Sequence, residues 1–154
     1  MALDSTMQAQ SEFSLLSKSK NGEISAEAKY NLASIQYKLG NYTTSENIIY
    51  EFISGSPSSE YWLAKMLILW ADIYVKEDNF PQAIATLQSI IDKYEGPDLV
   101  AVAKEKLAGV ITLEKQKDEQ KKQEMEQKKL KEDEPKINID ADKKQENKED
   151  DKLF

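Results

Sequence analysis

The chain has 154 residues and carries 28 acidic residues against 21 basic ones, all of them lysine. Because arginine is absent, the chain lacks the planar fork that usually reads phosphate and guanine, and we expect no nucleic-acid partner. Histidine and cysteine are also absent, which removes the commonest general base, the thiolate nucleophile and most zinc sites. We therefore predict a protein that is not an enzyme and holds no metal or cofactor.

No segment has the length of a membrane-spanning helix. The longest apolar run extends from Met66 to Ala71, whereas a bilayer needs roughly 20 residues. The first ten residues also lack the basic and apolar regions of a signal peptide. We expect no direct membrane insertion. The compartment stays open: the periplasm or cell envelope if the chain belongs to a longer secreted protein, and the cytoplasm otherwise.

Residues 1–22 are predicted to form a leading helix and a polar linker. The linker runs from Ser17 to Gly22 and consists of serine, lysine, asparagine and glycine, which favour turns. We interpret the helix as the second half of an incomplete preceding repeat. A frayed leader is the alternative.

Residues 23–113 are predicted to form the domain, and its first helical hairpin spans 24–57. Ser25 is the expected N-cap of the first helix, since its side chain can accept from free backbone N–H groups. Thr43 and Glu46 have the spacing of a capping box, which predicts the start of the second helix.

The second predicted hairpin spans 59–95. Its first helix, from Ser59 to Lys76, carries apolar residues at helical spacing. Pro81 begins the second helix, at a position where the missing N–H of proline has no intrahelical partner to lose. A further helix is expected over 98–113, with its apolar residues on one face, and it would cap the domain.

Residues 114–154 form a charged tail with 14 acidic and 12 basic residues. Such a segment buries too little apolar surface to offset the entropy lost on ordering. We predict a solvated helical extension to about Glu132 and disorder after Pro135. A coiled-coil or partner-binding helix is the competing hypothesis, but only Met125 and Leu130 are available as apolar heptad positions.

The two hairpins are related by a shift of 38 residues. The matching pairs are Leu32 and Trp70, Ala33 and Ala71, Ile35 and Ile73, Tyr42 and Phe80, Ser45 and Ala83, Ile49 and Leu87, and Phe52 and Ile90. A shift of 37 then maps Trp70, Ala71 and Ile73 onto Leu107, Ala108 and Val110. So many coincidences at one offset indicate a repeated helical hairpin.

This repeat resembles the tetratricopeptide repeat (TPR), a helical hairpin of about 34 residues. Ala33 and Ala71 take the small position of its large–small pair, Gly40 takes the turn, and Pro57 takes the closing position. Asp78 replaces the turn glycine in the second unit, and the longer spacing adds about one helical turn. The resemblance implies an all-α fold: a short right-handed α-solenoid of antiparallel helix hairpins with a C-terminal capping helix and a charged tail.

The order of the units is also similar to the carboxy-terminal repeats of large bacterial TPR proteins of the cell envelope. This similarity implies that the chain is the last portion of a longer solenoid. Further TPR repeats of the same full-length chain would then be among its partners, and the last helix would present a polar outer face.

In TPR proteins the first helices of successive hairpins line a concave groove that holds a peptide. The resemblance places nine residues there: Tyr30, Asn31, Ser34, Tyr37, Lys38, Lys65, Leu69, Asp72 and Lys76. The resemblance places Ile68 and Val75 of the second unit in the groove as well. Their aromatic, amide and lysine groups can pair with the backbone and carboxylates of a peptide. We hypothesise a protein–protein interaction module with an adaptor or assembly role, whose partner the sequence does not identify.

Three alternatives stay open for these residues and for the chain. The groove residues can be ordinary solvated surface, the chain can be a structural cap of a larger solenoid, or it can self-associate. A catalytic site is not expected, because Asp72 is the only acidic residue placed at the groove centre and glycoside hydrolysis needs two carboxylates. Trp70 is expected in the core, and Trp62 is expected to be partly exposed.

Overall fold

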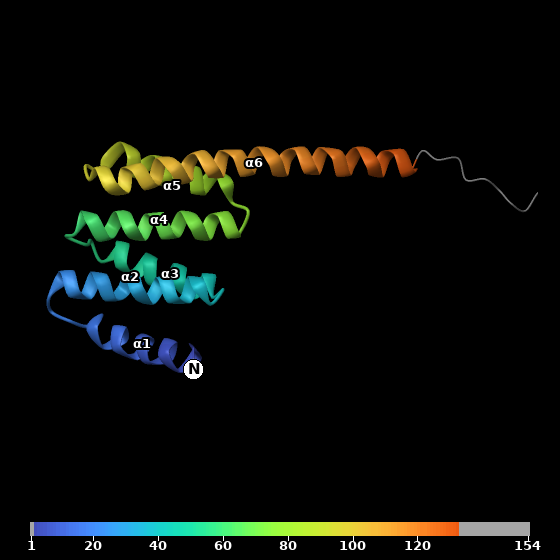
Figure 1. The fold of residues 1–154 in the computed structure, drawn as a ribbon. Helices are drawn as coiled ribbons and strands as arrows, with labels where there is room; N and C mark the ends of the chain where they lie inside the picture. Colours follow the sequence, from blue (N-terminus) through green and yellow to red (C-terminus); the bar gives the residue numbers. More distant parts are fainter. Residues whose placement is uncertain (1, 133–154) are drawn as a thin grey trace, which may run out of the picture. The chain divides into compact units, whose positions relative to one another are not determined.

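The computed structural model describes residues 2–132, which form helices and contain no strand (Figure 1). The helices are α1 (Ala2–Leu16), α2 (Gly22–Lys38), α3 (Tyr42–Ser54), α4 (Glu60–Lys76), α5 (Phe80–Lys93) and α6 (Pro97–Glu132). The predicted all-α fold is therefore confirmed over the described residues. Of the described residues, 2–116 belong to one compact unit and 117–132 to a second, and α6 contributes residues to both.

The start of α2 differs from the prediction. Asn21 is the N-cap, and its side-chain oxygen accepts hydrogen bonds from the backbone N–H groups of Glu23 and Ile24 at 3.0 and 3.3 Å. Ser25 lies inside the helix, where its hydroxyl donates to the carbonyl of Ser17 at 2.6 Å. The prediction of Ser25 as the N-cap was wrong because Asn21 offers the same capping chemistry one turn earlier.

The predicted capping box of α3 was also wrong. The N-cap of α3 is Asn41, and its side chain does not cap the helix. Its amide instead donates to Gln36 at 2.9 Å. Thr43 lies within the helix, and the carboxylate of Glu46 accepts a hydrogen bond from the indole of Trp70 at 2.9 Å. A tertiary contact between α3 and α4 thus replaces the local one.

The turns after α2 and α4 have the same backbone geometry. Gly40 and Asp78 both adopt positive φ angles, 79° and 59°. The N–H that follows each of them reaches back over the turn, from Asn41 to the carbonyl of Gln36 at 2.9 Å and from Asn79 to that of Tyr74 at 2.8 Å. These bonds satisfy carbonyls at the helix end, as a left-handed C-terminal cap does. Asp78 makes the turn without glycine, since aspartate tolerates this conformation better than most residues.

Each of the two turns joins a pair of helices that pack together: α2 on α3, and α4 on α5. Helix α4 also contacts α2 and α3, and α1 packs on α2 (Figure 1). Two apolar clusters result, one on each side of α4. The first contains Ala26, Ala33, Ile49, Phe52, Met66, Leu69 and Ile73. The second contains Ala64, Ile68, Ala71, Phe80, Ala83, Leu87, Ile90, Ala103 and Val110.

The small residues of the repeated pattern are buried where helices pack together. Ala33, Ala71 and Ala83 are buried, as the large–small pattern predicts. Ser45 is completely buried, and its hydroxyl donates to the carbonyl of Ala33 across the α2–α3 contact at 2.8 Å. Because no larger side chain stands between the backbones, the two helices can approach each other closely.

Trp70 differs from its predicted place in the core. It is only partly buried at the edge of the first cluster. Its ring stacks on that of Tyr74 with centroids 5.6 Å apart, while its N–H reaches Glu46. An indole N–H needs an acceptor, which favours this position at the boundary with solvent.

Within the first unit, α6 covers the second cluster through Ala103 and Val110. Ala108, which matches the buried Ala71 in the repeat, is exposed. In the second unit the helix continues to Glu132, and every side chain from 118 to 132 is exposed. The predicted disorder after Pro135 lies outside the described residues.

Candidate functional site

Helices α2 and α4 present side chains on a shared surface, which we call the α2–α4 face. Tyr30, Ser34 and Tyr37 have the spacing of one stripe along α2, and Lys65 and Asp72 lie two turns apart on α4. All five are partly exposed. The structure therefore brings together members of the predicted groove from both helices.

An aromatic cluster holds the lysine of this face. The Lys65 ammonium lies over the rings of Tyr30, Trp62 and Tyr61, at 4.3, 4.7 and 5.4 Å from their centroids. Trp62 also packs its ring on those of Tyr30 and Tyr61, with centroids 5.6 and 5.2 Å apart. The indole N–H of Trp62 donates to Glu23 at 2.9 Å, which links α4 to the start of α2. Cation–π attraction and this hydrogen bond fix the position of the charge.

Asp72 is the charged centre of the other half of the face. Its carboxylate accepts two hydrogen bonds from the Lys106 ammonium of α6, at 2.7 and 2.9 Å. Both side chains keep about a third of their surface exposed, 29% for Asp72 and 35% for Lys106, so the pair stays accessible from solvent.

The negative charge of Asp72 affects the pKa values of two tyrosines of α2, Tyr30 and Tyr37. Burial is the main cause that raises the pKa of Tyr30, and the negative charge of Asp72 raises it further. The same two causes, in the same order, raise the pKa of Tyr37. Both phenols therefore stay protonated at neutral pH, as hydrogen-bond donors and acceptors. The shared influence of Asp72 also indicates that the three groups lie near one another.

The remaining predicted groove residues lie at the borders of this face or away from it. Asn31 is partly exposed on α2, and Lys76 is exposed in the last turn of α4. Lys38 is exposed at the end of α2, where it lines a small pocket with residues of α1 such as Thr6 and Ala9.

Leu69 is a correction to the predicted groove. It is buried in the first apolar cluster, and its neighbour Ile68 is buried in the second. The reason is that α4 is covered on both sides, so apolar residues at adjacent positions enter different cores. The exposed strip of α4 is therefore narrower than that of a helix with one covered face. Leu69 lies outside this strip and is not accessible to a partner.

Four residues of this site were missed from the sequence: Glu23, Tyr61, Trp62 and Lys106. No spacing within either helix indicates the contact of Lys106 with Asp72, because the two residues are 34 positions apart and meet only in the tertiary structure. For Trp62 only partial exposure was expected, and its contacts with Tyr30 and Glu23 depend on how α4 crosses α2. The sequence pattern does not specify that crossing.

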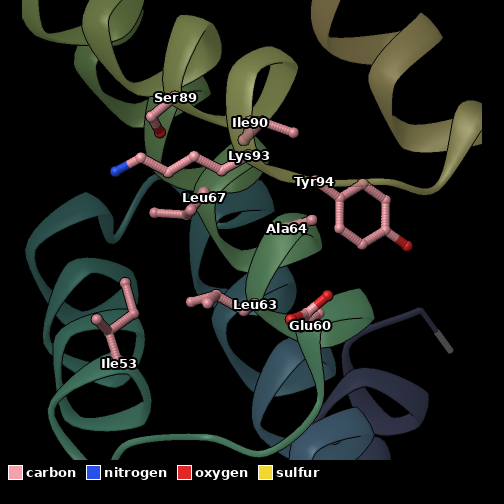
Figure 2. Close-up of a pocket in the computed structure, with 9 residues that line it drawn as sticks. All are labelled: Ile53, Glu60, Leu63, Ala64, Leu67, Ser89, Ile90, Lys93 and Tyr94. Atoms are coloured by element: carbon pink, nitrogen blue, oxygen red, sulfur yellow. The ribbon is translucent and has the colours of Figure 1, made fainter.

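A separate pocket of about 340 Å³ lies on the other side of α4 (Figure 2). Its wall is formed by Ile53 of α3, by Glu60, Leu63, Ala64 and Leu67 of α4, and by Ser89, Ile90, Lys93 and Tyr94 at the end of α5. No residue of the α2–α4 face belongs to it. The sequence pattern does not predict this pocket, because it forms where three helices meet.

Among residues 2–132 no group of three or more acidic side chains is arranged to hold a metal ion. None of the helices in that range is long and apolar enough to cross a bilayer. Comparison with protein-family models, with curated proteins and with solved structures found no match. The described residues form an all-α chain of paired helices, and its α2–α4 face carries aromatic and charged side chains.

Proposed function

We propose that this chain is a TPR-like protein–protein interaction module and that the α2–α4 face binds a peptide segment of its partner. The observation that carries the proposal is a group of side chains on one solvent-exposed surface. It consists of the rings of Tyr30, Tyr61 and Trp62, the Lys65 ammonium that lies over them, and the ion pair of Asp72 and Lys106. In this proposal α2–α3 and α4–α5 are successive hairpins of a short right-handed solenoid, with α6 as its cap.

The equivalence of the two helix pairs supports the solenoid. Gly40 and Asp78, which match at a shift of 38, have the same unusual backbone conformation. Ser45 and Ala83, which match at the same shift, are both completely buried. Agreement at turns and at core positions is what a structural repeat requires, because each unit must stack on its neighbour through the same residues.

The chemistry of the face supports a peptide as the ligand. Aromatic rings supply contact area at a small loss of side-chain entropy, and they are enriched where binding energy concentrates. Tyrosine hydroxyls, Ser34 and Asn31 can pair with peptide backbone groups. The Lys65 ammonium is positioned for a carboxylate of the partner, while the Asp72–Lys106 pair offers both signs of charge.

The test compares two double variants that carry the same chemical changes. Tyr37→Ala with Lys65→Glu alters the face, whereas Tyr50→Ala with Lys104→Glu alters exposed positions outside it. Each is used as bait for crosslinked partners in cells that express the chain, with folding checked by circular dichroism. We expect the face variant to lose partners that the control variant keeps. Recovery of the same partners by both folded variants would contradict the proposal.

A second candidate function is a structural cap of a larger solenoid, and the composition of α6 favours it. The surface that would accept a following helix carries Ala101, Lys104, Glu105 and Ala108, all exposed. A polar outer face of this kind is what a terminal repeat needs to stay soluble. The bacterial-envelope setting and the attachment to further TPR repeats stay predictions from the resemblance.

A further inference from the structure

The pocket between α3, α4 and α5 is independent of the α2–α4 face. Leu67 lies two residues after Lys65, about 200° around a helix of 3.6 residues per turn, so it points to the opposite side of α4. Figure 2 shows Ile53 and Leu63 facing each other across the pocket from α3 and α4. The wall residues of α4 span about 10 Å of helix, from Glu60 to Leu67.

The pocket is apolar inside and has one positive charge at its edge. Its volume of about 340 Å³ falls within the range of small-molecule sites. Lys93 extends along Leu67, and its ammonium lies at the end of the pocket away from Tyr94 (Figure 2). Among residues 2–132 no carboxylate lies within salt-bridge distance of this ammonium.

The opposite end of the pocket is negative. Glu60 lies there beside Tyr94, whose pKa is raised by burial first, then by the charges of Asp98 and Tyr61, and last by that of Glu60. An anionic group would be repelled at this end and attracted at the end of Lys93. The charges therefore orient a ligand with a single negative head.

The polar groups of the pocket do not suit an extended peptide. Apart from Glu60, which begins α4, the wall residues lie far enough along their helices for their backbone N–H groups to bond to carbonyls one turn earlier; Leu63 donates to Ser59 at 3.1 Å and Tyr94 to Ile90 at 2.9 Å. The hydroxyl of Ser89 already donates to Thr86 at 2.7 Å. A buried peptide backbone would lose its water without gaining partners, whereas an acyl chain has no such groups to satisfy.

From these observations we infer that the pocket binds an unbranched medium-chain carboxylate, with its acyl chain between Ile53 and Leu63 and its carboxylate on Lys93. Each methylene that leaves water for the pocket should tighten binding about three- to fourfold. The pairing with Lys93, at an open edge, should contribute about two- to fivefold.

The experiment titrates the ¹⁵N-labelled full chain with hexanoate, octanoate and octanol and follows amide shifts by NMR. We expect octanoate to bind about tenfold more tightly than hexanoate and more tightly than octanol, with shifts at Ile53, Leu63 and Ile90. Lys93→Gln should remove the preference for octanoate over octanol. Lys104→Gln, an exposed lysine on α6, should leave it unchanged.

Three outcomes would overturn the inference. One is equal binding of octanoate and octanol by the wild type. Another is an octanoate preference that survives Lys93→Gln. The third is tighter binding of the tripeptide acetyl-Ala-Ala-Leu than of octanoate, which would make a peptide terminus the ligand. Because Lys93 and Ile53 lie outside the α2–α4 face, failure here leaves the proposed peptide-binding function unaffected.

Discussion

Exchanging the buried residues Ser45 and Ala83 tests whether the two helix pairs are structurally equivalent. Ser45 is completely buried, and its hydroxyl donates to the Ala33 carbonyl at 2.8 Å. In Ser45→Ala the protein loses a hydrogen bond with a net value of about 0.5–1.5 kcal/mol and regains about 0.5 kcal/mol of helix propensity. The expected loss of stability is therefore at most about 1 kcal/mol.

The reciprocal change, Ala83→Ser, gives the sharper test. If the pairs are equivalent, the Ala71 carbonyl lies within reach of the new hydroxyl, and the stability should change by less than about 1 kcal/mol. If the carbonyl is out of reach, a hydroxyl is buried without a partner, at a cost of about 1–3 kcal/mol. Both positions are completely buried, so solvent cannot substitute for the missing partner.

Urea unfolding followed by circular dichroism measures both changes, with equal m-values as the check that only stability has changed. Ser45→Val is the packing control, because two methyl groups in place of the hydroxyl enlarge the side chain in a closed contact, which should cost about 1–3 kcal/mol. A loss above about 2 kcal/mol for Ala83→Ser would refute the equivalence. So would a neutral Ser45→Val, which would mean that α2 and α3 are not in close contact.

Other predictions concern turns, charges and pH. Gly40 has a φ of 79°, so Gly40→Ala should destabilise the protein by about 1 kcal/mol. Gly109 lies within helix α6 with open space around it, so Gly109→Ala should stabilise the protein by about 0.5–1 kcal/mol. Thermal unfolding should show a lower melting temperature for the first variant and a higher one for the second. A double-mutant cycle of Asp72→Asn and Lys106→Met should give a coupling free energy of about 0.5–1 kcal/mol, which weakens in high salt. A coupling free energy of zero at low salt would contradict the contact between α4 and α6. The folded-state pKa of Tyr30 is raised above the reference of 10.0, so its contribution to stability is complete below pH 10 and is lost as the pH rises through the folded pKa. Asp72→Asn should lower that pKa and reduce the alkaline loss, which ultraviolet titration and urea unfolding above pH 10 would measure.

The sequence predicted the helices well because strong local signals bound them. Gly40 and Pro81 mark a turn and a helix start, and both lie where the pattern placed them. The caps were less predictable, since Asn21 and Ser25 compete for the same role within one turn. Only the positions of the backbone N–H groups decide between them.

The candidate site was predictable only in part. Tyr30, Tyr37 and Asp72 were placed on this face by the resemblance to the tetratricopeptide repeat, and all three are partly exposed. Leu69 was misplaced because periodicity within one helix does not reveal that α4 is covered on two sides. Lys106 was missed because it belongs to a helix about 34 positions away in the sequence, and its contact with Asp72 is tertiary.

The most direct test of the peptide-binding face places a photocrosslinking amino acid at Ser34, between the two tyrosines, and compares it with the same amino acid at the exposed Tyr50 of α3. Irradiation of cells that express each variant should give an adduct with another protein from position 34 and none from position 50. Adducts from position 50 alone would contradict the account. Adducts from position 34 that contain only a second copy of this chain would replace partner binding with self-association.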